Sequence, residues 1–101
     1  MKYLVTYRRA PGADSLIAEH LPAHRDLFLS YQRRGVLLAI GPLQKPANGE
    51  ALAIFTSEDA AEEFVAVDPF VRYGVATCTI RPWHDVLESG AGEPGRPSEP
   101  S

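Results

Sequence analysis

Two residues of this sequence have types and positions suited to acid–base chemistry: His24 and Asp68. His24 shares one face of an expected helix with Leu27, Phe28 and Tyr31, so its ring points into the protein. Asp68 comes directly after a second expected helix, and its carboxylate could accept a proton from one ring nitrogen of His24, leaving the other nitrogen free as an acid or base. The alternative is that His24 is a core histidine bonded to a backbone group and that Asp68 only caps the turn that follows it.

The helix that carries His24 is expected over residues 22–34. Pro22 suits the first turn, where its missing N–H loses no hydrogen bond. Gly35 suits the left-handed position after the last turn. Residues 15–20 form a separate helical turn in this interpretation, with a break or sharp kink at Pro22, because the proline ring would clash with the carbonyl four residues before it.

The rest of the chain alternates between strand and helix patterns. Alternating side chains rich in β-branched and aromatic residues predict strands, and a hydroxyl cap followed by acidic residues predicts the second helix. The expected elements are strand 2–8, helix 22–34, strand 36–40, strand 51–56, a helix from Thr56–Ser57 to about Val67, and strand 75–81. This βαββαβ order predicts an α+β, ferredoxin-like fold, with a four-stranded antiparallel sheet and two helices on one face.

The expected second and third strands are apolar on both faces. In the third, Leu52 and Ile54 point to one face and Ala53 and Phe55 to the other. A sheet with one solvated face should alternate more cleanly between apolar and polar residues. We therefore expect a homodimer in which two copies pack through the open sheet face, the alternative being a monomer whose open face is unusually apolar.

Several motifs in order make the chain similar to the YciI-like (YCII-related) domain family. They are Pro22-Ala23-His24 at the start of a helix that ends in Arg34-Gly35, Ala39-Ile40-Gly41-Pro42, Asp68-Pro69-Phe70, Gly74-Val75 and Ile80-Arg81-Pro82-Trp83, within a match over about residues 1–87. The resemblance implies a ferredoxin-like fold that dimerises into an α/β barrel. It also implies a histidine–aspartate pair, proposed as catalytic, at His24 and Asp68. One relative in the family is a dehydrochlorinase, which implies lyase or isomerase chemistry by proton transfer.

Three functions are compatible with the pair of His24 and Asp68. The first is an enzyme without organic cofactor, in which His24 moves a proton on a small, cyclic, carboxylated substrate and Asp68 orients the ring. The second is a non-catalytic module that binds a small molecule in the same pocket. The third is a structural dimer in which the two residues form only a buried polar contact.

Further residues are candidates for contact with a substrate: Arg8, Arg25, Ser30, Gly41, Pro42 and Phe70. Arg25 lies off the inward stripe but would hold an anionic substrate if it turned toward the pocket. Gly41 and Pro42 are expected to allow a close backbone approach at the pocket edge. His20 and His24 have the spacing of a metal site, but a proline lies between them and no glutamate follows His20, so no metal is expected.

Composition narrows the class of protein. The 101 residues, 45% hydrophobic and 23% charged, are typical of one domain, which we expect over residues 1–88. A net charge of −3 provides no basic surface for nucleic acid or an anionic membrane. No apolar run approaches the roughly 20 residues that span a bilayer, no signal peptide is apparent, and the single Cys78 fits a reducing compartment, so we expect a cytoplasmic protein. Residues 89–101, rich in Gly, Pro, Ser and Glu, are expected to be a disordered tail.

Overall fold

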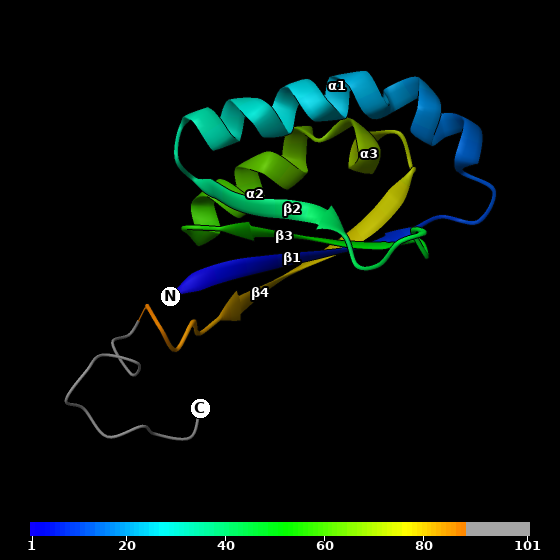
Figure 1. Ribbon diagram of the computed structural model, residues 1–101. Helices are drawn as coiled ribbons and strands as arrows, with labels where there is room; N and C mark the ends of the chain where they lie inside the picture. The colour runs from blue at the N-terminus through cyan, green and yellow to red at the C-terminus, as the bar shows by residue number, and fades with distance from the viewer. Residues whose placement is uncertain (89–101) are drawn as a thin grey trace.

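The computed structural model describes residues 1–88 (Figure 1). Its elements are β1 (Lys2–Arg9), α1 (Asp14–Arg33), β2 (Leu37–Pro42), β3 (Glu50–Phe55), α2 (Glu58–Val67), α3 (Pro69–Arg72) and β4 (Ala76–Trp83). The tail expected over 89–101 lies outside the described residues. Within residues 1–88, no helix combines the length and the apolar character that crossing a membrane requires.

The four strands form one sheet in the order β2-β3-β1-β4, and every neighbouring pair is antiparallel. All three helices lie on the same side of this sheet (Figure 1). The arrangement confirms the ferredoxin-like fold expected from the element order. It also brings the two halves of the chain together, because β1 lies between β3 and β4 in the middle of the sheet.

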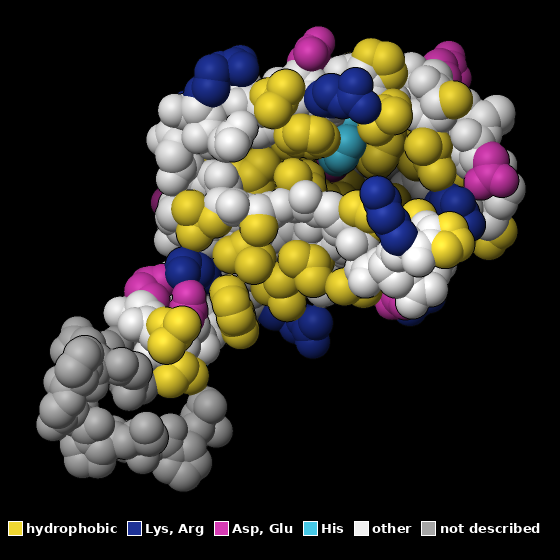
Figure 2. Space-filling view, in the orientation of Figure 1, with side chains coloured by type: hydrophobic (Ala, Val, Ile, Leu, Met, Phe, Trp, Pro, Cys, Tyr) yellow, Lys and Arg dark blue, Asp and Glu magenta, His cyan; other side chains and the backbone are white. Residues whose placement is uncertain are grey.

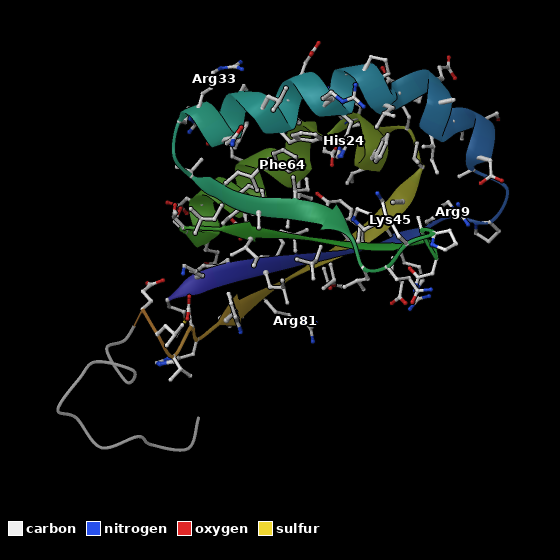
Figure 3. The ribbon with its side chains drawn as sticks, in the orientation of Figure 1. Arg9, His24, Arg33, Lys45, Phe64 and Arg81 are labelled. Atoms are coloured by element: carbon white, nitrogen blue, oxygen red, sulfur yellow. The ribbon has the colours of Figure 1, made fainter. Side chains whose placement is uncertain are left out.

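The core lies between the helices and the sheet. Val5, Ala53, Phe55 and Phe64 have no solvent exposure, and the Phe55 and Phe64 rings lie 5.2 Å apart. Figure 3 shows Phe64 in this layer beneath α1. Tyr31 presents its ring edge-on to Phe64 at 5.1 Å. Burial of each aromatic side chain contributes about 2–3 kcal/mol, and this packing is what fixes α1 and α2 on the sheet.

The expected break at Pro22 is wrong, because α1 runs without interruption through this residue. Proline removes one backbone hydrogen bond, but both halves of the helix pack on the fold beneath it. Leu21 lies over a cavity described below, and Tyr31 is in the core. Figure 1 shows the first turns of α1 leaning toward the sheet relative to the rest, so the helix bends near the proline instead of ending there.

Other elements also differ from the sequence prediction. Strand β2 runs from Leu37 to Pro42, although the strand was expected over residues 36–40. Strand β4 continues through Pro82, which pairs with Tyr3, although a proline was expected to end it. Since β4 is an edge strand, Pro82 can occupy it without breaking a ladder on both sides. The short helix α3 was not predicted at all.

Two predicted helix ends are confirmed. Gly35 follows α1 in the left-handed region, with φ of 78°, where a residue with a side chain would be strained. The Ser57 hydroxyl accepts a hydrogen bond from the backbone N–H of Ala60 and so caps α2. Both signals depend only on near neighbours in the chain, which is why the sequence shows them.

The sheet face opposite the helices carries apolar side chains. Leu4 lies opposite Ile54 in the register, and Leu52 is two residues before Ile54 on the same strand, so all three share this face. Each remains partly exposed in the single chain. No element of residues 1–88 covers them (Figure 1).

Candidate functional site

The structure brings His24 and Asp68 together. Nδ1 of His24, on α1, lies 2.8 Å from Oδ1 of Asp68, the residue between α2 and α3. Asp68 is 0% exposed and His24 is 8% exposed. A hydrogen bond at this distance orients the imidazole and determines which ring nitrogen remains available.

Asp68 accepts two further hydrogen bonds. The hydroxyl of Tyr7 donates to Oδ2 at 3.2 Å, and the backbone N–H of Phe70 donates to Oδ1 at 3.0 Å. Burial raises the pKa of Tyr7 well above its usual range, and the negative charge of Asp68 raises that pKa further. The Tyr7 hydroxyl therefore stays protonated and serves as a donor. The buried carboxylate is thus held by three donors from three different parts of the chain.

The local sequence explains why Asp68 is held so firmly. Pro69 disfavours the helical conformation for the residue before it, and Asp68 accordingly has φ of −63° and ψ of 122°. That extended residue ends α2 and caps α3 through the Phe70 N–H. Asp68 therefore makes both contacts that the sequence suggested, because its carboxylate caps the following turn and also contacts His24.

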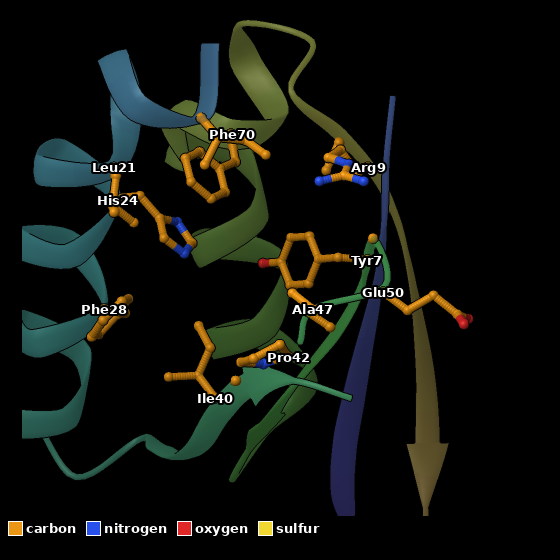
Figure 4. A pocket seen from close by; sticks show the side chains of 15 residues that line it. Tyr7, Arg9, Leu21, His24, Phe28, Ile40, Pro42, Ala47, Glu50 and Phe70 are labelled. Carbon is orange, nitrogen blue, oxygen red and sulfur yellow. The ribbon is translucent and has the colours of Figure 1, made fainter. Parts of the chain in front are cut away.

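Aromatic rings hold the imidazole on its other sides. The ring of Phe70 stacks on His24 with centroids 4.0 Å apart and planes 7° apart. Phe28 meets the imidazole edge-on at 5.3 Å. Within residues 1–88, Nε2 of His24 makes no hydrogen bond, and Figure 4 shows this edge of the ring facing an open cavity. The available nitrogen therefore faces the space in which a ligand would lie.

The cavity has a volume of about 550 Å³, the size of a small-molecule site. It lies between α1 and α3 on one side and, on the other, one end of each of the four strands and the loop that joins β2 to β3. Figure 2 shows it as a hollow with a histidine at its base and hydrophobic side chains around it. Its lining is Tyr7, Arg9, Ile17, Leu21, His24, Phe28, Ile40, Gly41, Pro42, Ala47, Gly49, Glu50, Ala51, Phe70 and Ala76.

Of the additional residues proposed from sequence, Gly41, Pro42 and Phe70 line the cavity. A bulge in β2 explains the orientation of Pro42. Leu37 pairs with Phe55, but the register then shifts between Leu37 and Ala39. The shift turns the later residues of the strand over, so that Pro42 faces the helices together with its partner on β3.

Arg8, Arg25 and Ser30 do not line the cavity. Arg8 alternates with the cavity residue Tyr7 along β1, so it points to the opposite face, where it pairs with Glu50 at 3.3 Å. Arg25 follows His24 on the helix and is turned to solvent. The Ser30 hydroxyl donates to the backbone carbonyl of Leu27 at 2.6 Å.

Sequence reasoning missed Tyr7 and Arg9 as site residues. Both lie on β1 with their side chains on the helix face, and the alternation of the strand contained the signal, since it grouped Tyr7 with Val5 rather than with Arg8. What the alternation could not indicate is which face the helices cover. Phe28, already placed on the inward stripe of α1, also lines the cavity.

His20 and Cys78 lie outside this site. His20 stacks its ring on Tyr73 with centroids 4.3 Å apart, and in residues 1–88 no group of three His, Cys, Asp or Glu side chains could hold a metal ion. Cys78 lies opposite Tyr7 on the face beneath the helices. Burial and the charge of Asp68 raise the pKa of the Cys78 thiol, so it remains protonated at neutral pH.

The chain is similar to known proteins in sequence and in structure. The family model of the YCII-related domain matches residues 1–84. No curated protein matches the chain. The 5-chloro-2-hydroxyhydroquinone dehydrochlorinase of Burkholderia phenoliruptrix, solved with 2,5-dihydroxybenzoquinone, has a similar structure, with a TM-score of 0.70 and 18% identity over 87% of this chain and 98% of the dehydrochlorinase. An antibiotic biosynthesis monooxygenase is more distant, with a TM-score of 0.49 and 16% identity over 84% of this chain and 100% of its own. At these identities the likeness shows the fold alone.

Proposed function

The chain belongs to the YCII-related domain family, and on this basis we propose that it is a cytoplasmic lyase or isomerase that transfers a proton on a small ring compound. His24 is the general acid or base, and Asp68 is the residue that positions it. The observation that carries the proposal is the orientation of the imidazole, because Nδ1 is bonded to a buried carboxylate while Nε2 faces an apolar cavity. This is the arrangement that acid–base catalysis by histidine requires.

The proposed reaction uses the available nitrogen of His24. The proton stays on Nδ1, which donates a hydrogen bond to Asp68. Nε2 therefore keeps its lone pair and removes a proton from an O–H or C–H group of the substrate. In an elimination, the electrons of the broken bond form a new double bond and expel an anion such as halide from the ring. In an isomerisation, the proton returns from Nε2 to another carbon. The carboxylate of Asp68 stabilises the imidazolium that forms in either case.

The shape and polarity of the cavity support a ring as the substrate. The wall consists mainly of apolar and aromatic side chains, which exclude water and offer flat surfaces to a planar molecule. A dehydrochlorinase of the same fold was solved with a dihydroxybenzoquinone, itself a small ring carrying oxygen substituents.

A proton-transfer assay on a panel of ring compounds tests the proposal. The wild-type protein is incubated under argon in D₂O with 5-chloro-2-hydroxyhydroquinone and with a set of small cyclic ketones and hydroxyquinones. We expect at least one compound to exchange a carbon-bound proton or to release halide faster than in protein-free solution, as followed by NMR and chloride determination. If compounds bind and raise the melting temperature but none reacts, the protein is a binding module and the enzyme proposal fails.

The proposed form of the enzyme is a homodimer joined through the open sheet face. Leu4, Leu52 and Ile54 support this, because they are partly exposed apolar side chains on the face that no helix covers. Ile54→Lys should convert the dimer to a monomer in sedimentation experiments, since it would bury an unpaired charge. Ala66→Lys, which adds the same charge on exposed α2, is the matched control and should leave the mass unchanged. A wild-type protein that sediments as a monomer would refute the dimer.

A further inference from the structure

We infer that Arg9 binds an anionic oxygen group on the ligand, so the cavity selects ring compounds that carry a negative charge. The inference rests on the proposed function, which supplies the ring. Among residues 1–88, Arg9 is the only Lys or Arg that lines the cavity. Arg8 and Arg25, the arginines that the sequence suggested for this role, both point elsewhere.

The geometry of β1 determines where the charge would be held. Tyr7 and Arg9 are two residues apart on the same face of the strand, which separates their backbones by about 7 Å. The Tyr7 hydroxyl reaches the base of the cavity, where it contacts Asp68, whereas Arg9 lies farther along the strand (Figure 4). A ring that contacts both His24 and Arg9 is therefore oriented, with the reacting atom at the base and the anionic group toward the β2–β3 loop.

The charges around Arg9 leave it free to bind a ligand. Asp14 pairs with the guanidinium at 3.2 Å, but the Asp14 side chain is 86% exposed and that of Arg9 is 41% exposed. Such a pair is weak and screened by solvent, so a ligand anion can replace Asp14 at little cost. Glu50 also borders the cavity, but its carboxylate bonds to Arg8 and Asn48 and points away in Figure 4.

The backbone around Arg9 is held in place. Its N–H donates to the Gly49 carbonyl at 2.7 Å, and Cβ and the guanidinium nitrogens Nε and Nη2 of Arg9 lie 3.7 Å from the position that a Cβ at Gly49 would occupy. Lys45, on the same loop in Figure 3, does not line the cavity. Among the described residues that line the cavity, Arg9 supplies the one guanidinium or ammonium group, so its charge should decide whether a charged ring binds.

Benzoate and benzamide provide a direct test, because they have nearly the same shape and differ in charge. We expect benzoate to bind the wild-type protein about tenfold more tightly than benzamide in NMR titrations. Arg9→Gln should remove this preference. Arg8→Gln is the matched control, since it changes the net charge equally on the opposite sheet face, and it should keep the preference. Asp14→Asn should tighten benzoate binding a few-fold, because it removes the internal competitor of the ligand.

The inference is overturned if benzoate does not bind, if benzamide binds equally well, or if the two arginine variants weaken benzoate binding alike. Equal weakening in the two arginine variants would mean that the net charge of the protein attracts benzoate, without a specific contact at Arg9. The two proposals fail separately. Binding that depends on Arg9 without turnover of any ring compound supports the inference and refutes the enzyme. Turnover that is the same for charged and neutral rings, and unchanged in Arg9→Gln, supports the enzyme and refutes the inference.

Discussion

Replacing Asp68 with alanine is expected to lower the free energy of unfolding by about 3–5 kcal/mol. The carboxylate is completely buried, and its removal leaves the Nδ1 of His24, the hydroxyl of Tyr7 and the N–H of Phe70 without their acceptor. It also removes the N-cap of α3. Urea denaturation at one protein concentration measures the effect, and fixing the concentration is necessary if the native state is a dimer.

Milder variants separate the contribution of the hydrogen bonds from general disruption. Tyr7→Phe removes one donor to Asp68 and should cost about 1 kcal/mol. Tyr3→Phe is the matched control on the same strand face, where the hydroxyl makes no hydrogen bond within residues 1–88, and it should cost close to nothing. Asp26→Ala removes an exposed carboxylate from α1 and should change stability by less than about 0.5 kcal/mol. Equal losses for Asp68→Ala and Asp26→Ala would show that the buried bonds contribute nothing.

The second large effect is expected on activity. His24→Ala should lower kcat/KM by about a thousandfold for whichever ring compound the proton-transfer assay identifies, within the range that general acid–base groups supply. The reason is that, among the described residues lining the cavity, no other side chain presents an available basic nitrogen beside the ring. Steady-state kinetics by halide release or proton exchange measures the change.

His20→Ala is the matched control for this prediction. His20 lies one turn earlier on α1, but its ring stacks on Tyr73 and does not line the cavity, so the variant should keep near wild-type kinetics. Asp68→Asn should lower kcat more than it raises KM, because it disturbs the orientation and charge stabilisation of His24 without contacting the ligand. If His24→Ala kept full activity, His24 would not be the general acid or base.

Local patterns in the sequence determined most of the fold. Three features were predictable because each depends on residues close together in the chain. They are the alternation along each strand, the Ser57 cap and the left-handed Gly35. The proximity of His24 and Asp68 could also be anticipated, since the first is on the inward face of one helix and the second directly follows the other. Their catalytic roles remain a proposal.

Only the tertiary structure decided which side chains share the cavity. Alternation separates Arg8 from Arg9, but the helices determine which of them faces a ligand, and the helices cover the side of Arg9. The continuity of α1 through Pro22 and of β4 through Pro82 has the same origin, because packing along both halves of the helix and the edge position in the sheet compensate for what each proline removes. The sequence by itself determined the four strands, the two long helices and their order, but not α3. Contacts between distant parts of the chain determined the faces, because the free energy of packing depends on neighbours that no local pattern contains.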